Sequence, residues 1–232
     1  VNDAPTLTAT GSNPTFIEDA GVAGLFSGTA IDPVESGDSV AGITLTVANL
    51  ADGSDELLTV DGEEVELTDG TTGTTAANGF GYSVSLSGTT AIVTLSKSDS
   101  AASWQTLVDG LAYRNASDAP TTASSRVVTL TSLQDDGGTA NGGTDTTALA
   151  VTSTVGITAV NDAPVIATSA GPSVQTGRSV TLTSAHLNAA DPDDTAAGLT
   201  YTLNTLPAGG KLFLSGTELT VNDTFTQQDI DD

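Results

Sequence analysis

The sequence predicts an all-β protein built from two consecutive β-sandwich modules. Threonine and valine are frequent and suit a half-buried pleated surface, whereas glycine, asparagine and aspartate mark turns. Several runs alternate apolar and polar residues with a period of two. The phrase "VNDAP" opens the chain and returns at residues 160–164, as a joint between modules would. We therefore expect one domain over 1–159 and a second over 160–232.

The clearest strand signal is "YSVSLSGTTAIVTLS" at residues 82–96, where two alternating runs flank a possible turn at 87–89. This pattern predicts a β-hairpin. Further strands are expected at 42–47, 126–133, 147–160 and 199–203. Turns are expected at the dipeptides 61–62, 69–70, 78–79 and 215–216.

One segment of the first module breaks the period of two. Trp104, Leu107, Val108 and Leu111 recur at helical spacing. The spacing predicts a short helix over 101–109, capped by Ser98 or Ser100 at its start and by Gly110 at its end. The apolar stripe places Trp104, the single tryptophan, in the core rather than in a ligand-stacking role.

The two copies agree beyond the joint. Residues 30–50 match residues 189–206, so Asp32 lies 30 residues after Asn2 and Asp191 lies 30 residues after Asn161. The second copy has 73 residues and no closing strand comparable to 147–160. We expect an incomplete sandwich with an open edge, either cut there or completed by strands of another chain.

Charge and composition restrict the possible partners. The chain carries 29 acidic and 5 basic residues, a formal net charge of −24. This charge excludes a nucleic acid bound through its phosphates and disfavours an anionic membrane, and no apolar run is long enough for membrane insertion. The absence of cysteine excludes disulfides and thiolate metal sites. Because methionine is also absent, we expect a fragment of a longer chain whose secretion signal lies elsewhere.

The acidic residues form groups in predicted loops. Short carboxylate and amide side chains in converging loops could supply the six to eight oxygens that calcium takes. The alternative is that they are solvated turn residues. No catalytic residues are expected, since His186 is the only histidine and lacks the neighbours of a triad or zinc site. The groups are Glu18 and Asp19; Asp32, Glu35 and Asp38; Asp135 and Asp136; Asn161 and Asp162; and Asp191, Asp193 and Asp194.

The order "VNDAP", "ED", then "DP" about 30 residues after the joint resembles cadherin-like domains. The wording of residues 110–120 and 133–164 resembles the Ig-like extender domains found in tandem in giant bacterial adhesins of the repeats-in-toxin type. The second copy resembles a chondroitin-sulfate-proteoglycan-type repeat, which is related to cadherin. The resemblance implies extracellular β-sandwiches in series on a bacterial surface, with Ca²⁺ at their junctions.

The resemblance also implies which residues bind calcium. For the junction near residue 160 these are Glu18, Asp19, Asn161, Asp162, Asp191 and Asp193. Asp3, Asp32 and Glu35 would serve a junction with a preceding domain. The "LDRE" motif of animal cadherins is absent, so Asp135 or Asp136 is expected to replace one ligand group.

Together these observations favour a calcium-stiffened structural segment of an extracellular bacterial adhesin or surface fibre, with a part in cell adhesion and biofilm attachment. Its partners would be neighbouring domains of the same or adjacent chains. One alternative is a filament subunit that forms a homopolymer by donating β-strands between chains. Another is a carbohydrate-binding module. An enzyme is not expected.

Overall fold

The computed structural model describes residues 1–232 and contains two compact units, Val1–Val160 (unit one) and Asn161–Asp232 (unit two). The boundary lies one residue after the position expected from the repeated phrase. Strands in several sheets make up both units, and only two short α-helices accompany them. The predicted all-β class is confirmed.

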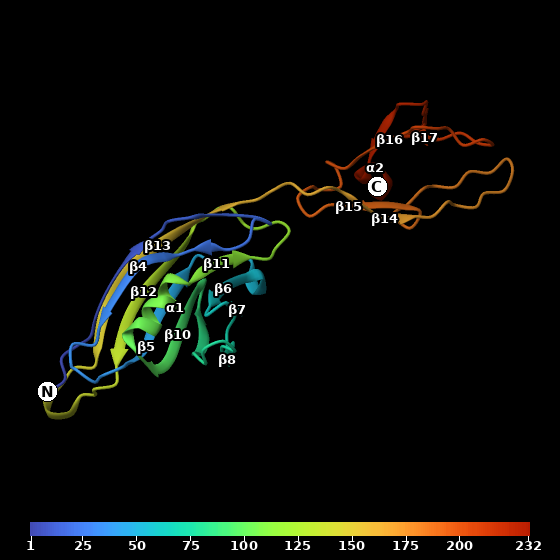
Figure 1. Cartoon of the computed structure of the whole chain (residues 1–232). Helices are drawn as coiled ribbons and strands as arrows, with labels where there is room; N and C mark the ends of the chain where they lie inside the picture. Colours follow the sequence, from blue (N-terminus) through green and yellow to red (C-terminus); the bar gives the residue numbers. More distant parts are fainter. The chain divides into compact units, whose positions relative to one another are not determined.

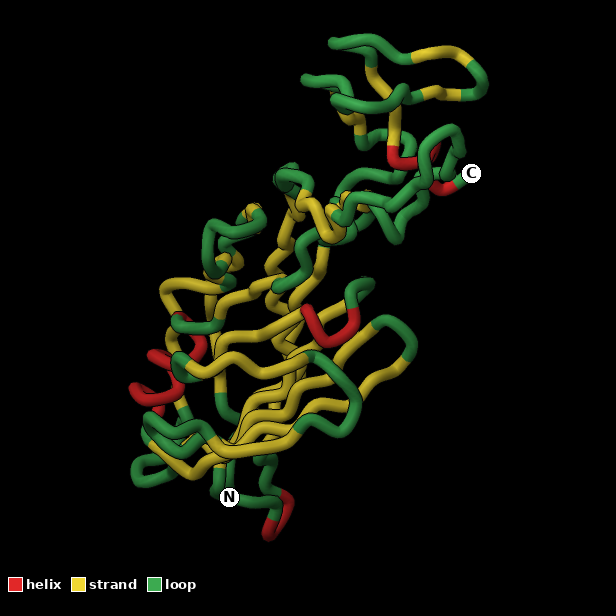
Figure 2. Tube along the Cα trace, turned by 90° about the vertical axis from the view of Figure 1, so that its right-hand side faces the viewer, coloured by secondary structure: helices red, strands yellow, loops and turns green.

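Unit one is built on a seven-stranded sheet (Figure 1). In spatial order its strands are β2 (Thr15–Ile17), β13 (Thr146–Thr158), β12 (Arg126–Asp135), β5 (Val40–Ala48), β10 (Thr90–Asp99), β9 (Gly81–Ser87) and β8 (Thr72–Thr74). All neighbours are antiparallel except β2 and β13, which are parallel. Figure 2 shows strands of unit one, in yellow, lying side by side.

Two smaller sheets complete unit one. The first contains β3 (Ala23–Gly24), β11 (Ala112–Asn115), β6 (Glu56–Val60) and β7 (Glu63–Glu66), and the second pairs β1 (Thr6–Gly11) with β4 (Phe26–Asp32). The alternation in β5 buries Ile43, Leu45 and Val47, each at most 1% exposed, in a contiguous core. The intervening threonines face outward, as the period of two requires.

The predicted turns have the expected backbone geometry. Ser87 pairs with Thr90, so a two-residue loop containing Gly88 closes the β9–β10 hairpin. Between β6 and β7, Asp61 and Gly62 both have positive φ (53° and 80°). Two successive residues at positive φ are the requirement of the type I′ hairpin turn, which explains the Asp-Gly pair.

The predicted helix is confirmed as α1 (Ala101–Asp109). The side chain of Ser100 caps it by accepting the Ser103 N–H. Trp104 is fully buried, donates its indole N–H to backbone carbonyls of Val40 and Lys97, and meets the Phe80 ring edge-on at 5.0 Å. Trp104 is thus a core residue. Two 3₁₀ turns, η1 (Gly53–Asp55) and η2 (Ala140–Gly142), complete the unit.

Unit two contains three two-stranded sheets: β14 (Val165–Ser169) with β15 (Leu187–Ala190), β16 (Thr200–Thr202) with β19 (Thr224–Thr226), and β17 (Phe213–Leu214) with β18 (Thr217–Glu218). A short helix that the sequence did not predict follows β19. This helix, α2 (Gln227–Asp231), begins with a capping box between Thr226 and Asp229. Its core is small, with Ala189, Leu199 and Ile230 as the buried apolar residues. Neither α1 nor α2 is long and apolar enough to cross a membrane.

Candidate functional site

Four polar residues gather where unit one begins, from three separate segments. Asn2 precedes β1, Glu35 and Asp38 lie in the β4–β5 loop, and Asp135 ends β12. We call these four residues the Asp135 group. The Asn2 amide donates to Asp135 Oδ1 and to the Thr144 carbonyl, at 2.9 Å in each case. These bonds fix the N-terminal segment against the loop that follows β12.

Several oxygens of the Asp135 group are buried and accept no hydrogen bond from the protein. Asp135 is only 2% exposed, yet its Oδ2 has no donor. Asn2 Oδ1 and Glu35 Oε2 are also buried and have no hydrogen-bond donor. A buried acceptor left unsatisfied costs about 1–3 kcal/mol, and more when it is charged. Three such oxygens in one group are what a cation site would contain.

Gly137 shows that two of the oxygens converge. A Cβ atom built on Gly137 would lie 2.2 Å from Asn2 Oδ1 and 2.6 Å from Asp38 Oδ2. Both oxygens therefore approach the same face of this glycine. Desolvation, followed by the charges of Glu35, Asp135 and Asp136, raises the pKa of Asp38 above its ordinary value. Both causes disfavour the charged form of Asp38, and the second reflects the carboxylates nearby.

The donor set determines which ions would fit. It contains only carboxylate and amide oxygens, which suits a hard cation such as Ca²⁺ and not zinc or copper. No group of three or more Asp, Glu, His or Cys side chains in the chain is placed to hold a metal ion. The amide oxygen of Asn2 and backbone carbonyls would therefore have to complete a calcium shell.

The residues predicted for the first joint have different roles. Glu35 belongs to the Asp135 group, and its Oε1 accepts the Asp3 N–H at 2.7 Å. Asp32 is exposed and accepts the Val34 N–H at 2.9 Å in a local turn. Asn2 and Asp38 were not among the calcium ligands predicted from the sequence, although Asp38 stands in the same acidic run as Asp32 and Glu35. That shared run is the only local pattern that links Asp38 to the predicted ligands.

Asp135 lies at the opposite end of β13 from Glu18. The Asp135 N–H donates to Asp145, just before β13, whereas the Glu18 N–H donates to Thr158, the last residue of β13. A 13-residue strand is about 43 Å long. Asp135 therefore cannot complete a site at Glu18.

Asp136 directly follows β12 and is therefore also far from Glu18. Its two carboxylate oxygens accept the Ser39 N–H at 2.8 Å and the Ser98 hydroxyl at 2.9 Å. The bond from Ser39, then that from Ser98, lowers the pKa of Asp136. Asp136 therefore holds two loops together.

Glu18 holds the last residues of unit one. It is 5% exposed, and its Oε2 accepts the Val160 N–H at 2.7 Å. Its neighbour Asp19 is exposed, has a positive φ of 61°, and lines a shallow pocket with Arg114 and Asp118. The two adjacent acids thus have different environments, and only Glu18 is buried.

Unit two repeats the arrangement seen at the first joint. Asp193 Oδ2 accepts the Asp162 N–H at 2.7 Å, as Glu35 accepts the Asp3 N–H in unit one. Asp191 Oδ1 accepts the N–H groups of Asp193 and Asp194, and its Oδ2 is buried without a donor. The Asn161 amide donates to the Asp162 carbonyl at 2.6 Å and is exposed. Both copies therefore use a later acid to hold the aspartate of "VNDAP".

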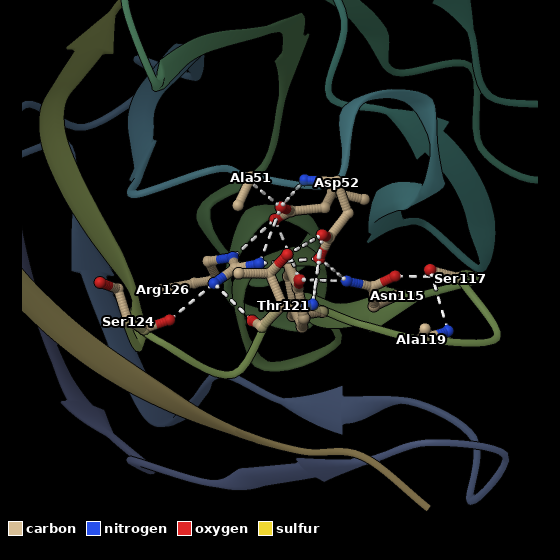
Figure 3. A network of polar contacts seen from close by, with 10 residues as sticks. Ala51, Asp52, Asn115, Ser117, Ala119, Thr121, Ser124 and Arg126 are labelled. Atoms are coloured by element: carbon tan, nitrogen blue, oxygen red, sulfur yellow. Dashed lines mark hydrogen bonds and ion pairs between the residues drawn. The ribbon is translucent and has the colours of Figure 1, made fainter. Parts of the chain in front are cut away.

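A second polar cluster in unit one is centred on the buried residues Arg126 and Glu56 and has no such free oxygens (Figure 3). Arg126 donates Nε and Nη2 to Glu56 and Nη2 to Asp52, at 2.9–3.0 Å, and donates Nη1 to the backbone carbonyls of Thr121 and Ser124. Glu56 also accepts the Tyr113 hydroxyl at 3.0 Å. Because donors and acceptors are matched, this cluster is a structural clamp on the loop between β11 and β12 and not a reactive centre.

This clamp predicts a pH-dependent contribution from Asp52. Burial alone would raise the pKa of Asp52, but hydrogen bonds from Thr121 and Asn115 and the charge of Arg126 hold it below the ordinary value. A lowered folded-state pKa gives stability that is present above the unfolded pKa and is lost as pH falls through the folded pKa. Asp52→Asn should therefore cost stability at neutral pH, and the gap to the wild type should close below about pH 4. Urea unfolding followed by Trp104 fluorescence measures both values, and a gap that is constant with pH would contradict the expectation.

Comparison with known proteins bears on unit two. The family described as Cadherin-like matches residues 164–232. No curated protein and no solved structure matches the chain. The match supports a cadherin-like fold of the adhesion-related, structural kind, which is typically extracellular and not catalytic. Domains of this kind generally bind Ca²⁺.

Proposed function

We propose that the chain is a calcium-stiffened extender segment of an extracellular bacterial adhesin or surface fibre, with a part in attachment and biofilm formation. The observation that carries the proposal is the set of buried oxygens without donors in the Asp135 group. The cadherin-like match in unit two and the repeated "VNDAP" joint add support.

In this proposal Asn2, Glu35, Asp38 and Asp135 hold a Ca²⁺ ion where unit one begins. The positive charge of the ion would offset the mutual repulsion of the three carboxylates. Because Asn2 is already bound to Asp135 and Thr144, the ion would fasten the N-terminal segment to both loops at that end. Binding to the folded state alone stabilises it by linkage, and this effect should be large in a chain of net charge −24.

The proposal extends to the other acids around the repeated phrase. In unit one Glu18 fixes the backbone of Val160, and in unit two Asp193 fixes that of Asp162. Asp191 adds a buried oxygen without a donor. We assign calcium binding to these residues together with Asp19 and Asn161, and stiffening of the joint is the expected consequence.

Calcium is expected to raise the stability of unit one. At free Ca²⁺ about 100-fold above its dissociation constant, the gain is about 2.7 kcal/mol by linkage. Thermal and urea unfolding followed by Trp104 fluorescence should show this gain and its loss on adding a chelator. Asp135→Asn should abolish most of it, whereas Glu66→Gln, at an exposed acid on β7, should leave it intact.

Small-angle scattering of the same samples tests the stiffening. In calcium the protein should show a narrow distribution of maximum dimensions, and in chelator that distribution should broaden. Identical unfolding midpoints and scattering profiles in calcium and in chelator would remove the calcium role from the proposal.

A second candidate function, assembly by strand donation, is favoured by one feature of unit two. Its apolar side chains Val165, Ile166 and Phe213 are 66%, 54% and 58% exposed, and β14 has a single neighbour in its sheet. An added strand could cover such residues. Filaments seen by electron microscopy would favour this alternative over a simple spacer.

A further inference from the structure

The outward face of the seven-stranded sheet in unit one carries no charged side chain. Alternate residues of β5, β9, β10, β12 and β13 face away from the core, and they are mostly threonine, serine and alanine. Cross-strand partners form regular rows: Thr152, Thr129 and Thr46 lie in one, and Ser83, Thr94 and Thr44 in the next. We call this surface the uncharged face.

The charged residues of these five strands are placed elsewhere. Arg126 and Asp135 are buried, and Lys97 and Asp99 pair with each other near the end of β10. The four-stranded sheet differs, since Glu64 and Arg114 form an exposed ion pair on it. In a chain with 29 acidic residues, a broad sheet surface without a single charge is a distinct feature.

We propose that the uncharged face is the surface through which a second copy of this chain associates in solution, sheet against sheet. Two copies of net charge −24 repel each other, and the repulsion acts most strongly where carboxylates meet. On the uncharged face no carboxylate opposes another, and no charge has to be desolvated.

The size of the face limits the interface that two copies can form. Five strands at about 4.8 Å spacing and about eight residues in length give roughly 500 Å² per copy, or about 1,000 Å² in total. This is the lower limit of specific interfaces, so a weak dimer is expected. In a fibre that repeats the unit, many weak contacts act together and would bind neighbouring fibres side by side. The association goes beyond the calcium-stiffened spacer proposed above, because it needs no cation.

Cross-linking tests the surface directly, because the chain has no cysteine. Thr94→Cys places one thiol on the uncharged face, and Thr8→Cys places one on β1, at another exposed strand threonine. A short bismaleimide linker is added in chelator and about 0.5 M NaCl, which screens the repulsion. We expect several-fold more covalent dimer from Thr94→Cys. Equal yields from the two variants would overturn the proposal.

Sedimentation velocity supplies the second test, again in chelator. The wild type should sediment faster as concentration rises, and more so at high salt. Thr94→Glu combined with Thr152→Glu should remove this dependence, whereas Thr8→Glu should keep it. Both threonines of the double variant are exposed, and its unfolding midpoint checks that it folds.

Each other result of the sedimentation test contradicts the proposal. A wild type that is monomeric up to about 1 mM would mean that no second copy binds there. Association that survives the double variant would place the contact elsewhere, as strand donation by unit two would. Since both tests exclude calcium, they can fail or succeed independently of the proposed calcium role.

Discussion

Replacing Arg126 by methionine is expected to destabilise unit one by about 3–5 kcal/mol. Arg126 has no exposed surface, and its guanidinium is the one positive charge beside Glu56 and Asp52. Methionine fills much of the same volume but leaves both carboxylates without their cation. The loss is therefore set by uncompensated buried charge and not by a cavity.

Urea unfolding followed by fluorescence measures this loss, because the single tryptophan lies in the core of unit one. Arg114→Met is the matched control: its ion pair with Glu64 is exposed, and its removal should cost less than about 1 kcal/mol. A cost for Arg126→Met no larger than that of the control would show that the clamp contributes little. Glu56→Gln offers an independent check, since Gln cannot match the charge of Arg126.

The strands and the helix of unit one could be predicted because their signals are local. The alternation in β5, β9 and β10 shows which side chains face the core. The two-residue turn between β6 and β7 requires positive φ at both positions, a conformation that Asp and Gly adopt more readily than most residues. The spacing of Trp104 and Leu107 defines the face of α1 within nine residues. In each case the information lies within about ten positions of the element.

The clamp and the Asp135 group could not be predicted in this way. Arg126 and Glu56 are 70 positions apart, and Asn2 and Asp135 are 133 apart. Strand register brings them together, and register depends on which strands pair across the whole unit. No local pattern distinguishes Asp135, whose Oδ2 lacks a donor, from Asp136, whose two oxygens are satisfied.

For a related reason, the sequence left open which junction Asp135 or Asp136 would serve. A missing ligand motif suggested a replacement, but the sequence does not show at which end of a module a loop lies. Because β12 and β13 are antiparallel, the loop joining them lies at the end of β13 opposite to Thr158. Helix α2 was missed for another reason: with five residues it is too short for a periodic signal, although its Thr226–Asp229 capping box was visible.

Gly137→Ala is expected to weaken calcium binding by tenfold or more while leaving unit one folded. The added Cβ would enter the space of Asn2 Oδ1 and Asp38 Oδ2, so both oxygens must move away from the point on which they converge. Losing one good oxygen ligand from a hard-cation site already costs on the order of tenfold in affinity. Gly137 is not at a positive φ, so alanine adds no backbone strain there.

Calorimetric titration with Ca²⁺ measures the affinity, and unfolding in chelator measures the fold separately. Gly24→Ala is the matched control, because a Cβ on that glycine meets no atom within 4 Å. If Gly137→Ala binds calcium as the wild type does, the ion does not sit between Asn2 and Asp38. If it loses calcium binding but keeps its stability in chelator, the loss arises from the displaced oxygens, and calcium binding at this end of unit one depends on the open space that glycine leaves.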